Sequence, residues 1–259
     1  MKAGLPQASV APNNAVRLTS VTVRAKQRVI LDDLSFHIPT GVVAGIVGPN
    51  GAGKTTAFRL LAGLIGTFSG EAEVLGYALP KNNDHIRSLI DMVPERDGLD
   101  DEMRVVDILD HWARLRFPGD RTLQAERIAA VLTQTKLQDR RFDRCGTLSS
   151  GLRRRVSIAR AMLHQPLVLL LDEVTNGLDI MSRQDFYEWL TTYRLQQADR
   201  TILFASHNTA EVARLCNFLV VMQSGRQVFC GPREQLLSED ATAEAIDAAF
   251  LALLCRSLR

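Results

Sequence analysis

The chain has 259 residues, of which 46% are hydrophobic and 23% charged, the composition of a soluble globular protein with one large domain or two small ones. Its 31 lysines and arginines nearly balance 29 aspartates and glutamates, so the net charge of +2 gives no electrostatic reason to expect nucleic-acid binding. The longest apolar runs, LVLLL and FLVVM, are far shorter than the ~20 residues that span a bilayer, so any membrane role should depend on a partner.

The N-terminal third of the chain predicts mostly strands. Residues 1–14 are rich in Pro, Asn and Ala and are expected to form a flexible tail, not a signal peptide. A β-like pattern follows over residues 16–38, and a turn at 39–41 leads into the apolar run VVAGIVG, typical of a buried parallel strand. Helical spacing begins within GAGKTTAFRLLAGL, and GEAEVLGY predicts another strand with a turn.

The remainder predicts helices alternating with buried strands. Residues 105–137 are expected to be helical with a break at 117–119, and further helices are expected over 150–163 and 182–197 and in TAEVARLC. The runs LVLLLDE and TILFASH predict buried strands, FLVVMQSGRQVFCG a hairpin, and ATAEAIDAAFLALLCRSL an amphipathic helix. This alternation favours an α/β layered fold with a mainly parallel sheet. The cysteines Cys145, Cys216, Cys230 and Cys255 form no Cys-x-x-Cys pair, as expected for reduced cytosolic thiols.

The segment GPNGAGKT, residues 48–55, matches the phosphate-binding pattern G-x-x-x-x-G-K-[ST]. Its glycines permit a tight loop whose N–H groups approach phosphates, and the following helix directs its positive end at the same anions. Lys54 is expected to reach the β- and γ-phosphates and the Thr55 hydroxyl to bind Mg²⁺. The candidate nucleotide-binding residues are Gly48, Pro49, Asn50, Gly51, Ala52, Gly53, Lys54, Thr55 and Thr56.

Two further strand ends carry candidate catalytic groups. Asp172 and Glu173 end LVLLLDE, where Asp172 is positioned to bind Mg²⁺ and Glu173 to act as general base toward water. His207 ends TILFASH and is expected to contact a γ-phosphate. The alternatives are acids that only cap the next turn and a histidine that is only a satisfied turn residue.

Five segments in chain order carry a family resemblance: GPNGAGKT, MVPERDGL, TLSSGLRRRVSIARAM, LVLLLDEVTNGLD and ILFASHN. They resemble the Walker A, Q-loop, signature, Walker B with D-loop, and switch-histidine elements of ABC transporter ATP-binding subunits. The resemblance implies a P-loop NTPase fold with a RecA-like, mainly parallel sheet, an antiparallel β subdomain and an inserted α-helical subdomain. It places the ATPase domain at residues 15–232, with the helical subdomain at about 97–146, and a helical extension at 233–259.

The resemblance also assigns roles. The signature of one subunit closes over the ATP held by a second ATPase subunit, so Ser149, Ser150 and Gly151 would bind the partner's nucleotide, with Asp179 as the D-loop carboxylate. Glu95 occupies the Q-loop position and would join Thr55 and Asp172 around Mg²⁺, while Lys54, Glu173 and His207 would be catalytic. As local structure, the same serines would simply begin a helix.

Four positions depart from the family pattern. Ser150 and Leu152 replace Gly and Gln of the usual signature, Glu95 replaces Gln, and Val174 stands where Pro is common. The aromatic that stacks on adenine is missing, and Arg24 is the candidate to stack in its place. The arginines at 153–155 are expected to form a solvated or ion-paired face.

The resemblance is closest to ABC-2 type exporters, with ATP and Mg²⁺ as cofactors and integral membrane permease subunits as partners. It implies that the subunit sits at the cytoplasmic face of the inner membrane and that the helical subdomain docks a coupling helix of the permease near the Q-loop. Two alternatives remain at this point: an ATP-gated clamp or regulatory subunit with low turnover, and a nucleic-acid-associated ATPase, which the balanced charge disfavours.

Overall fold

The computed structural model describes residues 13–196, 199–238 and 241–256. The tail expected at residues 1–14 therefore lies almost wholly outside the described residues, and Asn14 already begins the first strand. Within the described part of the chain, no helix is both long and apolar enough to cross a bilayer.

One sheet is antiparallel and has the strand order β2-β1-β4-β5. It consists of β1 (Asn14–Ala25), β2 (Arg28–Pro39), β4 (Ser69–Val74) and β5 (Tyr77–Ala78). Buried and exposed residues largely alternate along β1 and β2, because successive side chains of a strand point to opposite faces. One face of this sheet therefore packs on the core, as the β-like pattern in the sequence predicted.

The second sheet has the order β10-β9-β3-β8-β7-β6, and all its pairings are parallel except β9 with β10. Every residue of β3 (Val43–Val47), β7 (Val168–Asp172) and β8 (Thr201–Ser206) is buried, as expected for parallel strands covered on both faces. The remaining strands are β6 (Ile90–Val93), β9 (Phe218–Gln223) and β10 (Arg226–Pro232).

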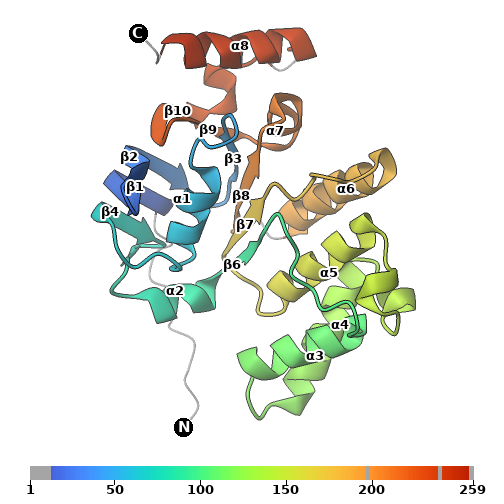
Figure 1. Ribbon diagram of the computed structural model, residues 1–259. Coiled ribbons are helices and arrows are strands. Elements are labelled where there is room, and N and C mark those ends of the chain that lie inside the picture. The colour runs from blue at the N-terminus through green and yellow to red at the C-terminus, as the bar shows by residue number, and fades with distance from the viewer. Residues whose placement is uncertain (1–12, 197–198, 239–240, 257–259) are drawn as a thin grey trace.

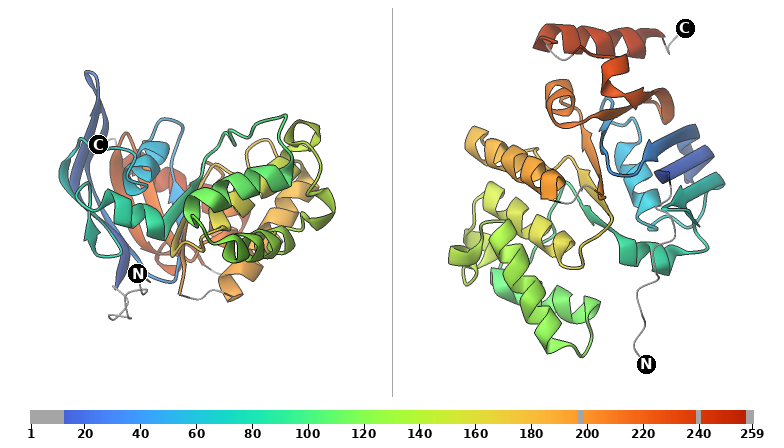
Figure 2. Two further views of the ribbon diagram at one scale, coloured as in Figure 1. Left: turned by 90° about the horizontal axis from the view of Figure 1, so that it is seen from below. Right: turned by 180° about the vertical axis from the view of Figure 1, so that it is seen from behind.

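The helices cover both faces of this sheet (Figure 1). Helix α1 (Lys54–Leu61) packs in the core between the two sheets, while α3 (Val105–Arg116), α4 (Arg121–Gln134) and α5 (Ser150–Met162) gather on the side away from the antiparallel sheet, as Figure 2 shows. The other α-helices are α2 (Asn83–Leu89), α6 (Ile180–Gln196), α7 (Thr209–Leu215) and α8 (Ala243–Arg256), and short 3₁₀ turns lie at Gln138–Arg140, Cys145–Thr147 and Arg233–Gln235.

The architecture confirms the predicted α/β class, with a mainly parallel sheet, an antiparallel sheet and a group of helices. Two elements were not predicted, α2 and β6. Helix α2 spans 7 residues and buries only Ile86, too little for a helical pattern to be visible in the sequence. Strand β6 spans 4 residues and contains Asp91, so no continuous apolar run marks it.

Candidate functional site

The phosphate-binding loop connects β3 to α1, as the sequence predicted. Gly53 caps α1 with φ of 102°, a backbone conformation that side-chain-bearing residues rarely adopt. Gly48 is required for a different reason, because a Cβ there would lie 2.2 Å from the backbone oxygen of Met222. One glycine of the motif thus shapes the loop, and the other allows it to pack on β9.

Lys54 is the first residue of α1, and its side chain is only 6% exposed. Its Nζ donates a hydrogen bond to the Gly48 carbonyl at 2.7 Å and lies 3.1 Å from Glu173 Oε1. The ammonium is therefore held inside the curve of the loop and beside the candidate base. A cation in this position would meet any phosphate that the loop binds.

Glu173 and His207 lie beside each other because β7 and β8 are neighbouring parallel strands, whose carboxyl ends meet at one edge of the sheet. Glu173 Oε2 is 2.9 Å from His207 Nδ1. Glu173 has φ of 50°, in the left-handed region that costs an L-residue roughly 1–2 kcal/mol. Its N–H donates to the Ala205 carbonyl at 3.0 Å, which helps to hold this backbone in place.

Asp172 is 1% exposed, and its Oδ1 has no hydrogen-bond partner within the described residues. Burial raises the pKa of Asp172, the nearby carboxylates of Glu173 and Glu95 act in the same direction, and a hydrogen bond from Thr55 opposes them. A buried, under-coordinated carboxylate beside a hydroxyl is a donor set that suits a hard divalent cation. Thr55 and Asp172 therefore fit the predicted magnesium site.

A cavity of about 440 Å³ joins Lys54, Thr55, Glu173 and His207, while Asp172 lines the neighbouring groove. The structure brings together in its wall most of the predicted loop residues with Glu95, Glu173 and His207; the lining residues are Arg28, Ile30, Asn50, Gly51, Ala52, Gly53, Lys54, Thr55, Thr56, Glu95, Glu173, Asn176 and His207. Pro49 does not line it but accepts a long hydrogen bond, 3.4 Å, from Lys54 through its carbonyl.

Arg24 does not reach this cavity; Arg28 and Ile30 do. The reason is strand register. Arg24 pairs with Val29 across the β1–β2 hairpin, and directly opposed residues share a face of the sheet, whereas Arg28 and Ile30 occupy the other face. The sequence placed an arginine near the cavity, but the residue that lines it lies on the second strand of the hairpin.

The predicted signature residues do not line the cavity of their own chain. Ser149 caps α5 and accepts a hydrogen bond from the Leu152 N–H at 3.3 Å, and the Ser150 hydroxyl donates to the Gly177 carbonyl at 3.2 Å. Both serines are exposed. The helix-capping interpretation is therefore confirmed as local structure.

Gly151 packs against the start of α6. A Cβ on Gly151 would lie 2.2 Å from Ser182 Oγ, so this glycine is needed for the α5–α6 contact. Ser182 is in turn bound by Asp179, which accepts from its N–H at 2.9 Å and its hydroxyl at 2.7 Å. These hydrogen bonds lower the pKa of Asp179. Ile180 and Met181, which lie between Asp179 and Ser182 in the sequence, are 83% and 73% exposed. They form an exposed apolar patch near the signature turn.

Glu95 lies between two hollows of the surface. Its Oε1 accepts a hydrogen bond from Asn176 Nδ2 at 3.1 Å, and it lines both the nucleotide cavity and a neighbouring groove of about 700 Å³. The groove is rich in arginine and also reaches Thr55 and Asp172; its charged lining residues are Arg59, Arg87, Arg96, Arg116, Arg160, Asp91, Glu95 and Asp172. The Glu95 segment thus separates the two hollows.

Sequence reasoning missed Glu211, a buried acid in α7. Its carboxylate accepts hydrogen bonds from Thr175 at 2.9 Å, Ser206 at 3.0 Å and Tyr187 at 2.6 Å. Burial and the hydrogen bond to Glu211 raise the pKa of Tyr187. The network ties the segments after β7 and β8, which carry Glu173 and His207, to α6 and α7. Its partners are 5–36 residues apart along the chain, so no local pattern could have identified it.

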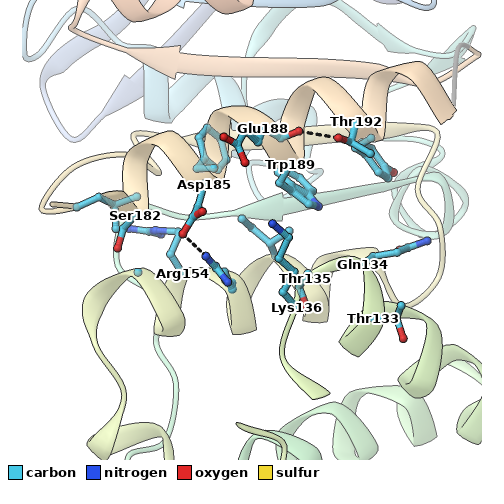
Figure 3. A pocket seen from close by; sticks show the side chains of 16 residues that line it. Thr133, Gln134, Thr135, Lys136, Arg154, Ser182, Asp185, Glu188, Trp189 and Thr192 are labelled. Atoms are coloured by element: carbon cyan, nitrogen blue, oxygen red, sulfur yellow. Dashed lines mark hydrogen bonds and ion pairs between the residues drawn. The ribbon is translucent and has the colours of Figure 1, made fainter. Parts of the chain in front are cut away.

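A separate cavity of about 370 Å³ lies between α5 and α6. Figure 3 looks into it, with Ser182, Asp185 and Trp189 extending from α6. Arg155 forms an ion pair with Asp185 across it. None of the candidate catalytic residues lines this cavity, although Gly151 of the predicted signature does.

Comparison with known proteins gives a consistent result. Residues 31–176 match the family model described as ABC transporter. The chain is 34% identical over 219 residues to Nod factor export ATP-binding protein I of Cupriavidus metallidurans, covering 85% of this chain and 71% of the relative. The protein of the same name from Burkholderia thailandensis is 34% identical over 240 residues, with 92% and 77% covered.

Solved structures share the fold. The structure of cbiO1 from Clostridium perfringens, described as part of the ABC transporter complex cbiONQ, superposes with a TM-score of 0.78 at 23% identity, covering 95% of this chain and 97% of that one. A bacterial Atm1-family ABC exporter with ATP bound has a TM-score of 0.76 at 25% identity, covering 95% of this chain and 44% of the exporter chain.

Proposed function

The chain belongs to the ABC transporter family, and we propose that it drives an exporter. As a member of this family it is an ATP-binding and ATP-hydrolysing transporter subunit that works with membrane components. The export direction is supported by the relatives, which are named export ATP-binding proteins. The observation that carries the catalytic proposal is the single cavity in which the phosphate loop, Lys54, Glu173 and His207 meet.

Lys54 and the loop N–H groups bind the β- and γ-phosphates of ATP in this proposal. Lys54 already lies inside the loop, where it donates to the Gly48 carbonyl. Thr55 and Asp172 would hold Mg²⁺, with Glu95 beside them, and the ion would neutralise charge on the phosphates. The unpartnered Oδ1 of Asp172 supports this assignment. Arg28, which lines the cavity on the hairpin side, is the candidate to stack on adenine through its guanidinium plane.

Glu173 is proposed as the general base. It accepts a proton from water as that water attacks the γ-phosphorus, the bond from phosphorus to the bridging oxygen breaks, and ADP and phosphate result. His207 lies 2.9 Å from Glu173 and would stabilise charge on the γ-phosphate oxygens as it develops. The Glu211 network holds the two strand ends in register, so these groups are positioned before the reaction.

We propose that two copies, or this subunit and a related one, complete each other's sites. Two features support this assembly. Ser149 and Ser150 are exposed at the start of α5 and do not line the nucleotide cavity of their own chain. Ile180 and Met181 form an exposed apolar patch near them. A helix N-terminus with exposed serine hydroxyls suits an incoming γ-phosphate. Apolar surface of this kind favours burial against a partner.

The arginine-rich groove is the proposed docking site for the permease at the cytoplasmic face of the membrane. Of its lining residues, Arg116 belongs to the helical subdomain expected at about 97–146, and the others come from the segments around it. Within the described residues, the side chains of Arg59 and Arg96 are exposed and make no ion pair or hydrogen bond. Free cations at a groove of about 700 Å³ favour a permease segment that carries carboxylates.

An ATPase assay on the purified full chain tests this function. Phosphate release with Mg-ATP is expected in the wild type and is expected to disappear in Lys54→Ala and Glu173→Gln. Co-purification from detergent-solubilised membranes then tests the partner, and an integral membrane protein is expected to accompany the wild type. Phosphate release that persists in both variants would contradict the assigned site.

A further inference from the structure

Two adjacent arginines of α5 hold the segment that contains Glu95. Arg154 donates to the carbonyl of Pro94 at 2.7 Å through Nη1 and to the carbonyl of Glu95 at 2.6 Å through Nη2. Arg153 makes a two-pronged ion pair with Asp97, at 2.9 and 3.0 Å. Two guanidinium groups of α5 therefore bind three residues of the segment, Pro94, Glu95 and Asp97. The planar guanidinium, with several N–H donors, suits such paired acceptors.

Arg154 is unusual among these contacts because it is a buried cation that has, within the described part of the chain, no carboxylate in hydrogen-bond range. It is 8% exposed, and both of its hydrogen bonds go to backbone carbonyls. Burial lowers the pKa of Arg154, while the carboxylates of Asp97, Glu95 and Asp172 act against this. A buried charge is costly unless its environment compensates it, and here the compensation comes from Asp97 and from two acids of the nucleotide site, Glu95 and Asp172.

The segment held by Arg154 is hydrogen-bonded directly to α5. It follows β6, an edge strand of the parallel sheet, and its residue Glu95 lines the nucleotide cavity and the arginine-rich groove. Among the described residues, the Glu95 side chain is held by one hydrogen bond, from Asn176 at 3.1 Å. The position of the Glu95 carboxylate therefore depends on the backbone hydrogen bonds from Arg154.

We propose that Arg154 is a positioning residue for ATP hydrolysis, which fixes the backbone of Pro94 and Glu95 to the signature helix. The inference rests on the proposed catalytic site. Arg154 does not touch the nucleotide cavity; it acts through Glu95 and offsets the extra negative charge that Glu95 brings near Asp172. As a result, a displacement of α5 is transmitted to Glu95, and a displacement of Glu95 is transmitted to the signature turn.

Arg155 is a matched control on the same helix. It is also partly buried, with 24% of its side chain exposed, but it pairs with Asp185 on α6 and not with the Glu95 segment. Arg155→Met therefore removes a comparable guanidinium without releasing Glu95. Arg154→Lys serves as the conservative variant, because one ammonium keeps the charge but cannot make the paired contacts of a guanidinium.

The test compares kcat and KM for ATP in full-length Arg154→Met, Arg154→Lys and Arg155→Met, with Glu173→Gln as the inactive reference. Arg154→Met is expected to lower kcat about tenfold or more, because small misplacements of site groups are that costly. Its KM should change less than about twofold, since the phosphate loop is untouched, and Arg154→Lys should recover part of kcat. Amide hydrogen exchange of residues 95–97 should rise in Arg154→Met and not in Arg155→Met.

A suppressor experiment separates positioning from general destabilisation. If Arg154 offsets the charge of Glu95, Glu95→Gln should restore part of the kcat lost in Arg154→Met, while the melting temperatures of the single and double variants show how much stability each has lost. An unchanged kcat in Arg154→Met, or a loss matched by Arg155→Met, would overturn the inference. If one of these results occurs while Glu173→Gln is inactive, the proposed function still stands. If Glu173→Gln hydrolyses ATP, the catalytic site on which the inference rests is itself refuted.

Discussion

Lys54 Nζ lies 3.1 Å from Glu173 Oε1, and both side chains are more than nine-tenths buried. Each charge therefore depends on the other, since removal of one partner leaves a buried charge uncompensated. The pair links the phosphate loop to the end of β7, so that the cation for phosphate and the candidate base share one hydrogen-bonded centre. Stability and catalysis are coupled at this point of the fold.

A double-mutant cycle measures that coupling. Lys54→Met is expected to lower the free energy of unfolding by about 3–5 kcal/mol because Glu173 loses its buried partner. Adding Glu173→Gln should restore part of this loss, with a coupling energy of about 1–3 kcal/mol. Urea unfolding of the two single variants and the double variant gives the energies; strictly additive losses would mean that the pair does not interact in solution.

Glu173→Gln isolates the chemical step. The amide keeps the shape of the side chain but cannot accept the proton of the attacking water, so phosphate release should fall by about 10²–10⁴-fold. ATP affinity should stay within a few-fold of the wild type, because the loop and Lys54 are intact. Single-turnover kinetics and equilibrium binding of labelled ATP measure the two effects. Release at the wild-type rate would remove Glu173 as the base.

Much of this site could be predicted because its groups stand at strand ends. A lysine in a glycine-rich loop after β3, acids after β7 and a histidine after β8 converge wherever parallel strands are neighbours. The sequence could not show which face of the β1–β2 hairpin each residue occupies, so it selected Arg24, and the register places Arg28 in the cavity instead. A shift of one residue reverses the face.

Contacts between segments distant along the chain could not be predicted from the sequence either. The arginines at 153–155 were expected to form a solvated or ion-paired face, and they are indeed bonded, but Arg154 bonds to backbone carbonyls about 60 residues away. Gly151 was expected to allow approach of a phosphate; in the fold it also admits Ser182. Such roles depend on how α5 packs, which no local pattern records.

Gly151→Ala tests the packing role. The added Cβ would lie 2.2 Å from Ser182 Oγ, and overpacking of this kind costs about 1–3 kcal/mol. Ser182→Gly removes the clashing atoms, so the double variant should regain stability relative to Gly151→Ala. Thermal unfolding of Gly151→Ala, Ser182→Gly and the double variant measures these changes in stability. Gly177→Ala would be an unsuitable control, because Gly177 has φ of 73° and an added side chain would strain its backbone. Failure of Ser182→Gly to recover any stability would show that the clash is relieved elsewhere.

His164 predicts a pH dependence of stability. Burial lowers the pKa of His164 to about 4, whereas an unfolded histidine titrates near pH 6.5. The unfolded chain therefore binds more protons between these values, and stability falls as the pH falls from 6.5 toward 4. For this residue alone the loss from pH 7 to pH 5 is about 2 kcal/mol.

The measurement is urea unfolding at pH 7 and pH 5 for the wild type, His164→Leu and the exposed His111→Leu. His164→Leu should lose less stability on acidification than the wild type, and His111→Leu should behave like the wild type. Asp91, whose Oδ2 lies 3.6 Å from His164, has a pKa that burial raises, which acts in the opposite direction and is present in all three chains. Equal losses in all three would exclude His164 as the source.

The central claim is that the signature turn of one subunit completes the ATP site of another, and sedimentation velocity of Glu173→Gln with Mg-ATP tests it most directly. We expect a dimer that contains bound ATP, which Ser149→Phe abolishes while leaving ATP binding to the monomer intact. A mixture of Glu173→Gln chains carrying either Ser149→Phe or Lys54→Ala should form dimers with one ATP each. Two results together would contradict the claim: Glu173→Gln stays monomeric with Mg-ATP, and Ser149→Phe in the otherwise wild-type chain leaves ATP hydrolysis unchanged.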